Sequence, residues 1–326
     1  MAHVSLRYDL RAPDFAAASM ADRYRACLEQ CSFGDANGIG MAVISEHHGV
    51  EDGYLPSPLV LAAAIASRTT KMSISISALL VPLHDPLRLA EDIAVLDLLS
   101  GGRVVIIAGL GYRHEEFEMF GIDKARRGRR LDENLTVMKQ AWTGEPFEYA
   151  GRTVRVTPRP MTQPHPMVLV GGSTEVAAKR AARHRLPFMP AIGDPALADL
   201  YRAACAAEGF EHPLVVLPSG PGFVHVTEDP ERAWAKIERC ALYEAMSYAS
   251  WQTPGQRSNV HTEATNRAEL EASGVYWVVT PDECVERAKT LGSRGGVVLH
   301  PLMGGMEPDD GWESLELFVN KVLPRL

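Results

Sequence analysis

Residues 72–111 read MSISISALLVPLHDPLRLAEDIAVLDLLSGGRVVIIAGLG, and this stretch decides the fold class. Serine alternates with isoleucine at its start, which predicts a strand over Met72–Leu80. A helical segment follows at Pro86–Leu99 and ends at Ser100-Gly101-Gly102. The β-branched run Val104–Ala108 then predicts a fully buried strand. Two buried strands joined by a helix are typical of a parallel βαβ unit.

The same alternation recurs along the chain, which has 326 residues. About eight strand–helix units in one chain predict an α/β fold, a single (β/α)8 barrel over residues 1–326. The dinucleotide fingerprint G-x-G-x-x-G is absent after the first strand, which disfavours a doubly wound sheet. The further strands are predicted at His3–Leu10, Met41–Ser45, Val168–Val170, Leu186–Pro190, Val275–Val279 and Gly296–His300, with an interrupted extended segment at Leu214–Val226. The further helices are predicted at Ser19–Asn37, Ser57–Arg68, Arg130–Trp142, Glu175–Arg185, Pro195–Glu208, Asp229–Ser250, Pro281–Leu291 and Trp312–Val322.

Two segments interrupt the alternation. Phe147–Met161 is rich in threonine, arginine and proline, and we interpret it as an inserted hairpin with an extended tail. Trp251–Glu271 is polar and irregular, and we expect it to be the mobile segment of the chain. Neither segment has the composition of a linker, so one domain is expected.

Composition and charge exclude several classes of protein. The apolar content of 46% is that of a globular chain, and the formal net charge of −8 disfavours a nucleic-acid partner. Apolar runs are far shorter than the roughly 20 residues that a membrane span needs. The five cysteines form no C-x-x-C pair, and the N-terminus lacks the pattern of a signal peptide. The sequence therefore predicts a cytoplasmic protein with no membrane association.

Active sites of such barrels lie at the carboxyl ends of the strands, so we searched there for chemistry-bearing residues. Glu46-His47-His48 follows the second strand, where a histidine oriented by a carboxylate can transfer protons. Structural hydrogen bonding remains an alternative. A metal site would need partners such as His84 or His300, and the zinc pattern H-E-x-x-H is absent, so no metal is expected.

Small residues follow three other strands. The serines up to Ser77-Ala78 leave room for a flat ligand, or they fill a tapered barrel layer. Gly109-Leu110-Gly111-Tyr112-Arg113 lets the backbone approach a ligand, or it is a plain tight turn. Gly171-Gly172-Ser173-Thr174 opens a helix, whose amide groups and dipole favour a phosphate. An ordinary helix cap explains the last pattern as well.

These motifs resemble the bacterial luciferase-like flavin monooxygenases, a family of (β/α)8 barrels. The resemblance covers nearly the whole chain. It is strongest at Ser45–Gly49, Ala78–Asp97, Leu99–Gly121 and Arg159–Arg183. The motifs are long and stand in the same order and spacing as in the family.

The resemblance assigns roles to individual residues. It implies that His47 contacts the flavin ring and transfers protons beside it, with Glu46 and His48 completing the motif. It also implies a non-prolyl cis peptide at Ser77–Ala78 against the ring, and a phosphate site at the turn of glycines and hydroxyls. The residues that it assigns to cofactor binding are Ser77, Ala78, Gly109, Gly111, Tyr112, Arg113, Gly171, Gly172, Ser173 and Thr174. His84 lies in the matching loop after the third strand.

One departure from the family keeps the cofactor open. Many members that use flavin mononucleotide (FMN) carry an arginine where this chain has Leu110, and that arginine meets the phosphate. The Tyr112-Arg113 pair that follows is also a variant of members that use the deazaflavin coenzyme F420. The positive charge for the phosphate would then come from another residue, such as Arg113.

The resemblance implies a monooxygenase that uses reduced FMN, delivered by a separate flavin reductase, and O2 on a small apolar substrate. One alternative is an F420-dependent oxidoreductase that transfers hydride. Others are a non-catalytic flavin-binding protein and a metal hydrolase on the same fold. The resemblance also implies a homodimer, for which the small and apolar faces of helices Ser57–Arg68 and Pro86–Leu99 are suited.

Overall fold

The computed structural model describes residues 3–253, 257–292 and 295–326. Its contacts group into two compact units. The first unit comprises Met1–Val43, Val50–Pro56 and Pro218–Leu326. The second unit comprises Ile44–Gly49 and Ser57–Leu217.

The first unit carries parallel strands in the order β10-β9-β11-β1. The register pairs Leu6 of β1 with Leu299 of β11, and Val278 of β10 with His225 of β9. Its strands are β1 (His3–Tyr8), β2 (Met41–Ile44, whose last residue belongs to the second unit), β9 (Phe223–Val226), β10 (Tyr276–Val279) and β11 (Gly296–Leu299). Its helices are α1 (Met20–Ala36), α8 (Pro230–Trp251), α9 (Arg267–Ala272), α10 (Pro281–Leu291) and α11 (Pro308–Leu317).

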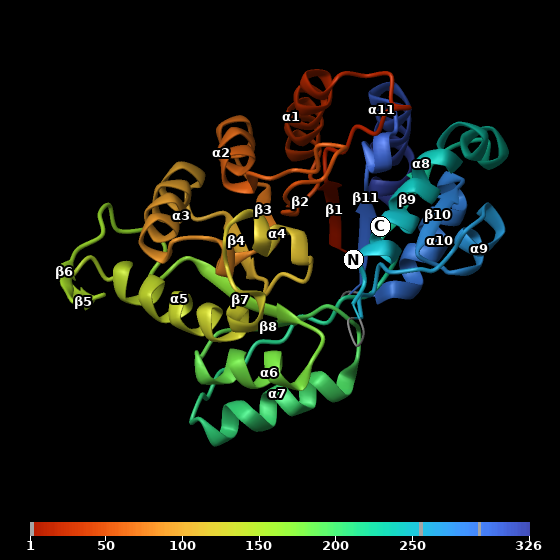
Figure 1. Cartoon of the computed structure of the whole chain (residues 1–326). Coiled ribbons are helices and arrows are strands. Elements are labelled where there is room, and N and C mark those ends of the chain that lie inside the picture. The colour runs from red at the N-terminus through yellow and green to blue at the C-terminus, as the bar shows by residue number, and fades with distance from the viewer. Residues whose placement is uncertain (1–2, 254–256, 293–294) are drawn as a thin grey trace. The chain divides into compact units, whose positions relative to one another are not determined.

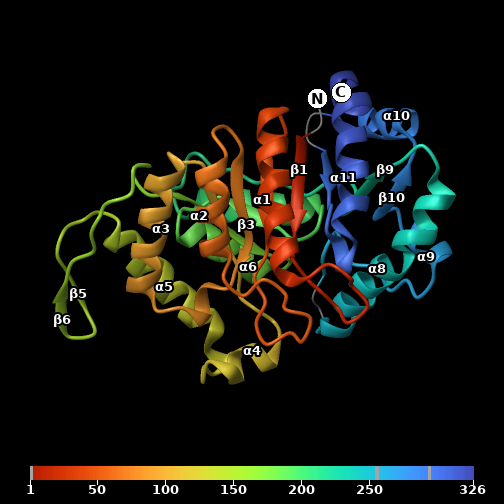
Figure 2. The same ribbon diagram turned by 90° about the horizontal axis from the view of Figure 1, so that it is seen from above.

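The second unit carries parallel strands in the order β3-β4-β7-β8. Helices α2 and α3 lie side by side, and α6 and α7 form another adjacent pair (Figures 1 and 2). Strands β5 and β6 form a separate antiparallel hairpin within the segment interpreted as an insertion. The strands are β3 (Ser73–Leu79), β4 (Val104–Ala108), β5 (Phe147–Tyr149), β6 (Arg152–Val154), β7 (Met167–Gly172) and β8 (Phe188–Pro190). The helices are α2 (Pro58–Arg68), α3 (Pro86–Ser100), α4 (His114–Met119), α5 (Arg127–Ala141), α6 (Glu175–Arg183) and α7 (Pro195–Ala207).

Several helices begin with the same local signal, a capping side chain followed by proline. Asp85 accepts hydrogen bonds from the amide groups of Leu87 and Arg88 at the start of α3. Thr280 and Glu283 form a reciprocal capping box at the start of α10. The cap satisfies amide groups that have no partner within the helix, and proline suits the first turn because its missing N–H is not needed there. This local chemistry explains why most helix starts follow from the sequence.

Apolar side chains fill a core in each unit. In the first unit, Phe223 and Tyr276 from the strands pack with Trp234 and Ile237 of α8. In the second unit, the isoleucines of β3 and the residues of β4 are largely buried, and the Trp142 Nε1–H donates to the carbonyl of Ala90 at 3.0 Å. The alternating and β-branched patterns therefore mark core strands, and the parallel α/β class is confirmed.

Three predicted segments differ from the structure. Helix α4 lies in a stretch for which the sequence predicts no element, because its six residues are too few to show a helical period. Helix α9 occupies part of the segment 251–271, of which residues 254–256 lie outside the described residues. The extended segment Leu214–Val226 contains only the short strand β9. Across the described ranges, no helix combines the length and apolar character that crossing a membrane requires.

Candidate active site

His47, just after β2, contacts a buried glutamate. Its Nδ1 atom lies 2.7 Å from Oε1 of Glu116, a residue of α4 with no solvent exposure. The same oxygen accepts the backbone amide of His48 at 3.0 Å. On the other side of the ring, Nε2 lies 3.2 Å from the hydroxyl of Tyr112. The ring of His47 is therefore held between a carboxylate and a phenol, an arrangement that can hold and move a proton.

Glu46 binds the other two histidines of the site. Its Oε1 lies 2.9 Å from Nε2 of His48 and 2.8 Å from Nε2 of His84, and its Oε2 accepts the amide of Leu80. Burial alone raises the pKa of this carboxyl group, but the hydrogen bonds from His48 and His84 outweigh burial and lower the pKa to about 2. Glu46 is therefore a fixed negative charge that orients two imidazole rings, and His84 belongs to the site.

Arg113 ties the loop after β4 to the end of β2. Its Nη1 donates to the carbonyl of His48 at 2.9 Å and lies 3.6 Å from Oε1 of Glu116. These contacts hold the guanidinium beside the histidines. A role of Arg113 toward a cofactor phosphate stays a prediction.

The end of β3 supplies a bulge of small residues. The peptide between Ser77 and Ala78 is cis, so the predicted cis bond is confirmed. The register with β4 shifts between Ser77 and Leu79, and the hydroxyl of Ser45 donates to the carbonyl of Ser77 at 2.8 Å. A Cβ atom on Gly109 would lie only 2.6 Å from the Cβ of Ala78. Glycine is therefore required where the end of β4 approaches the bulge.

The turn after β7 leads into α6. Thr174 caps the helix by accepting the amide of Ala177 at 3.3 Å, as the ordinary-cap interpretation expects. Gly172 has a φ of +138°, and a Cβ there would lie 2.8 Å from Ala177. Glu175 is exposed and pairs with Lys179. The start of α6 is thus left without an inward-facing carboxylate, which suits an anion.

The structure brings most of the predicted residues into one network within the second unit. Glu46, His47, His48, Tyr112, Arg113 and Ser77 are linked through direct contacts or through their immediate neighbours, and Ala78 lies against Gly109. Gly171 lies beside β4, where a Cβ atom added to it would lie 3.0 Å from Cγ2 of Ile107.

Sequence reasoning missed Glu116. Three glutamates stand close together on α4, at positions 115, 116 and 118, and the sequence alone does not separate them. Only Glu116 is buried, because the adjacent Phe117 packs into a small cluster with Leu80 and Leu83. Phe117, an apolar residue next to Glu116, could have indicated which glutamate is buried. Using that signal requires knowing that the segment is a helix, which the sequence pattern does not indicate.

The residues present fit a flavin. The partly exposed Ser77 and Ala78, with Gly109 behind them, offer a face of small side chains for a planar ring. Hydroxyl groups and the start of α6 offer donors for a phosphate. The histidines that follow β2 are held by carboxylates, His47 by Glu116 and His48 by Glu46. Histidines held in this way can accept and release protons.

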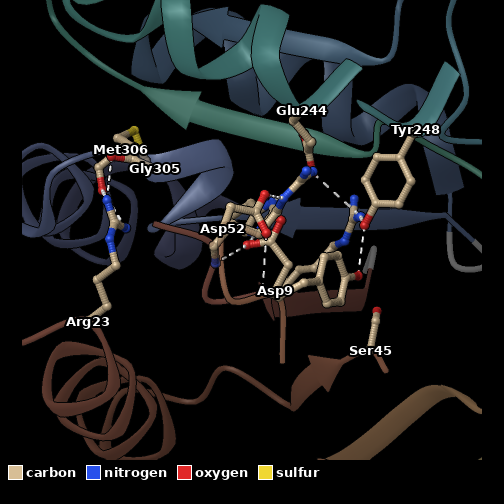
Figure 3. Close-up of polar contacts among 12 residues, drawn as sticks. Asp9, Arg23, Ser45, Asp52, Glu244, Tyr248, Gly305 and Met306 are labelled. Carbon is tan, nitrogen blue, oxygen red and sulfur yellow. Dashed lines mark hydrogen bonds and ion pairs between the residues drawn. The ribbon is translucent and has the colours of Figure 1, made fainter. Parts of the chain in front are cut away.

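The first unit holds a second buried cluster of ionisable groups, shown in part in Figure 3. Nε2 of His300 lies 3.6 Å from Asp9, and its Nδ1 lies 3.4 Å from Glu244. Arg7 lies 3.5 Å from Glu244 and donates to the hydroxyl of Tyr248 at 3.0 Å. Burial lowers the pKa of His300, but the two carboxylates outweigh burial, so its pKa is raised. An imidazolium between two carboxylates accounts for this geometry.

Asp9, Glu244 and His300 are also the one group within the described ranges whose ligand atoms lie close enough for a metal ion. The two carboxylates face opposite nitrogens of His300, however, and an ion on one nitrogen would leave the other carboxylate without its partner. The neighbouring guanidinium of Arg7 also repels a cation. The cluster is therefore better explained as an ion-pair network than as a metal site.

The parallel strands and the helices between them define an α/β protein, with a candidate site formed by the histidines after β2 and the bulge after β3. The family model described as luciferase-like monooxygenase matches residues 4–298. The chain belongs to this family.

Relatives and solved structures agree with this assignment. Limonene 1,2-monooxygenase of Rhodococcus erythropolis is 26% identical over 91% of this chain and 80% of its own length. The oxygenase component of flavin-dependent trigonelline monooxygenase of Acinetobacter baylyi is 28% identical over 45% of this chain and 42% of its own length. Several curated relatives are matched over only about half of their length, and an uncharacterised Sinorhizobium fredii protein over 58%.

Two solved structures share the fold over almost the whole chain. The oxygenating constituent of 3,6-diketocamphane monooxygenase from Pseudomonas putida, in complex with FMN, has a TM-score of 0.75 at 19% identity, covering 100% of this chain and 99% of that one. An F420-dependent secondary alcohol dehydrogenase with an F420–acetone adduct has a TM-score of 0.68 at 16% identity, covering 99% and 98%. The predicted (β/α)8 fold class is confirmed by this likeness.

Proposed function

We propose that the protein is a flavin-dependent monooxygenase that uses reduced FMN and O2 on a small apolar organic substrate. The observation that carries the proposal is the placement of His47, held by Glu116 and Tyr112, two residues after Ser45, whose hydroxyl donates to the carbonyl of Ser77 in the bulge. Membership of the family and the monooxygenases among its relatives support it. The family model spans segments of both units, which supports a single domain.

Each part of the site has a role in this proposal. Reduced FMN, when bound, supplies the electrons that activate O2. Gly171, Gly172, Ser173 and Thr174 bind its phosphate, and the small residues of β3 and β4 contact its ring. His47 holds or releases a proton at Nε2, while Glu46 fixes the rings of His48 and His84. Phe117 and its neighbours seal the base of α4 against water.

A binding experiment tests the cofactor. FMN, riboflavin and F420 are titrated into the protein under anaerobic conditions, and their fluorescence is followed. We expect FMN to bind more tightly than riboflavin, because riboflavin lacks the phosphate that the start of α6 would hold. Equal affinity for the two would contradict the phosphate site. Tight F420 binding without FMN binding would instead favour the alternative of hydride transfer, which the F420-dependent structural neighbour supports.

Oxygen uptake tests the activity. With chemically reduced FMN and a panel of small apolar compounds, we expect substrate-dependent O2 consumption and one oxygen atom from 18O2 in the product. FMN binding with no product under any of these conditions would favour the non-catalytic flavin-binding alternative.

A relative named as an oxygenase component supports a separate flavin reductase as the partner that delivers reduced FMN. The five unpaired cysteines suit the proposed cytoplasmic setting.

The outer face of α2 and α3 supports the proposed homodimer. Val60 on α2 is 72% exposed and Leu99 on α3 is 61% exposed, and Val95 and Leu98 extend the same apolar character. Large exposed aliphatic side chains on adjacent helices favour burial against a second copy. Sedimentation should give twice the chain mass of 35.6 kDa, and the double variant Val60→Glu, Leu99→Glu should give the monomer. Met246→Glu, at an exposed position of α8, is the control that should stay dimeric.

A further inference from the structure

We propose that Glu116 is a positioning residue that fixes the tautomer of His47, so that Nδ1 carries a proton and Nε2 is the working nitrogen. The inference rests on the proposed function for its catalytic meaning, but its structural content can be tested without any cofactor. The contact that carries it is the 2.7 Å distance between Nδ1 of His47 and Oε1 of Glu116.

The other groups that contact Oε1 of Glu116 show where the proton shared with His47 resides. Oε1 of Glu116 accepts the backbone N–H of His48 at 3.0 Å, and a backbone amide can only donate. The guanidinium of Arg113, also only a donor, lies 3.6 Å from the same oxygen. An oxygen that receives these groups is an acceptor, so the proton in its contact with His47 resides on Nδ1. The carboxylate therefore selects one of the two neutral tautomers.

The other ring nitrogen, Nε2, then faces Tyr112 rather than the carboxylate. With Nδ1 protonated, Nε2 of a neutral His47 has a lone pair and accepts the hydroxyl proton of Tyr112, which lies 3.2 Å away. When His47 takes up a proton at Nε2, the ring becomes a cation and the carboxylate of Glu116 stabilises it. The proton leaves again from Nε2, so the histidine returns to its starting state with the proton on Nδ1 unchanged.

The surroundings hold Glu116 in place. Phe117 is fully buried against Leu80 and Leu83, which anchors α4. Oε2 of Glu116 is buried and has no hydrogen-bond partner within the described part of the chain, so the side chain is fixed through Oε1. A carboxylate in this position acts through its contact with His47, as the buried aspartate of a Ser-His-Asp triad acts through its histidine.

The direct test is 15N NMR of the His47 ring in the protein without cofactor. We expect an Nδ1–H signal and an unprotonated Nε2 in the wild-type protein at a pH where the ring is neutral. The reverse assignment in the wild-type protein would overturn the proposal, even if no variant folds. In Glu116→Leu, which removes the acceptor, we expect the signal to shift toward the Nε2–H tautomer. An unchanged tautomer in a folded Glu116→Leu variant would also overturn it.

The matched control is Glu115→Gln, which changes the adjacent, exposed glutamate of the same helix and should leave the His47 signals in place. In turnover, Glu116→Gln should lower kcat by about 10- to 100-fold, by analogy with the loss of the carboxylate partner of a metal-bound histidine, with KM and the affinity for FMN little changed. A KM or FMN defect at unchanged kcat would contradict a positioning role. If the wild-type protein shows no turnover at all, the proposed function fails, and the NMR assignment still decides the role of Glu116.

Discussion

The two buried histidine clusters use their ring nitrogens differently. In the second unit, His47 gives one nitrogen to a carboxylate at 2.7 Å and presents the other to a tyrosine hydroxyl. In the first unit, His300 faces a carboxylate with each nitrogen, at 3.4 and 3.6 Å. A histidine with both nitrogens committed to buried carboxylates has no nitrogen left for a ligand. The comparison therefore separates a histidine arranged for chemistry from one arranged for stability.

The environments of the two clusters support the same distinction. His47 lies between Glu116 of α4 and Tyr112 of the loop after β4, and Ser45, two residues before it, binds the bulge at the end of β3. His300 faces Asp9, which follows β1, and Glu244 of α8, both labelled in Figure 3, and Arg7 of β1 pairs with Glu244. The guanidinium of Arg11 binds Asp52 at 2.5 Å and lies over the rings of Tyr243 and Trp251. Such a network orders β1 against α8 within the first unit.

The largest expected effect is the loss of turnover on replacing His47. His47→Ala should reduce kcat by about 10²–10⁴-fold, the range that a general acid or base contributes. Flavin affinity should fall less than kcat, because the proposed role of the ring is proton transfer. The melting temperature should also fall, because the buried carboxylate of Glu116 loses its partner. Steady-state kinetics and FMN titration measure the two effects separately. Unchanged turnover would remove His47 from the mechanism.

Replacing His300 should lower the free energy of unfolding and leave the active site intact. His300→Ala leaves Asp9 and Glu244 without their shared cation, and breaking a buried ion pair costs about 3–5 kcal/mol. Urea unfolding should show this loss, while the folded fraction keeps the wild-type affinity for FMN. A variant of normal stability that lacks turnover would place His300 in the active site and break the comparison.

Two buried groups, Glu46 of one cluster and His300 of the other, should also respond to pH with opposite signs. The pKa of Glu46 lies below its unfolded value of 4.5, so its stabilisation is present above pH 4.5 and is lost as the pH falls toward 2. The difference corresponds to about 3 kcal/mol. The pKa of His300 lies above its unfolded value of 6.5, so its stabilisation is present below pH 6.5 and is lost as the pH rises through the folded pKa.

Unfolding measured across this pH range checks both signs. Glu46→Gln should flatten the acid side of the stability curve, and His300→Gln should flatten the alkaline side. Glu115→Gln, at an exposed position, should change neither side. If Glu46→Gln altered the alkaline side instead, the assignment of the fixed charge would be wrong.

The smallest expected effect concerns the bulge beside the histidines. Gly109→Ala places a methyl group 2.6 Å from the Cβ of Ala78, and such overpacking costs about 1–3 kcal/mol. Both groups are rigid, so the bulge must shift and FMN affinity should fall. Ala78→Gly in the same chain removes this contact and should restore part of the lost stability and binding, because the added methyl group still lies 3.3 Å from the carbonyl oxygen of Leu79. Failure of this second change to rescue the first would show that the two positions do not contact each other.

The sequence by itself determined the elements and the motifs. Alternating and β-branched runs marked β3 and β4, and the caps before proline marked the starts of helices, because these signals depend on neighbouring residues. The residues after the strands were found in the same way, since the carboxyl ends of parallel strands define where a site can lie. The cis peptide at Ser77–Ala78 followed from the family motif and is present.

Only the tertiary structure decided which charged groups meet. Glu116 and His47 are 69 residues apart, and their contact depends on how Phe117 docks α4 against Leu80 and Leu83. Glu116 resembles its two glutamate neighbours in the sequence, and burial alone distinguishes it. His300 likewise received its partners from the opposite end of the first unit's sequence, Asp9 after β1, and from α8. Periodicity records which face of an element is apolar, whereas the pairing of buried charges depends on strand register and on packing between distant elements.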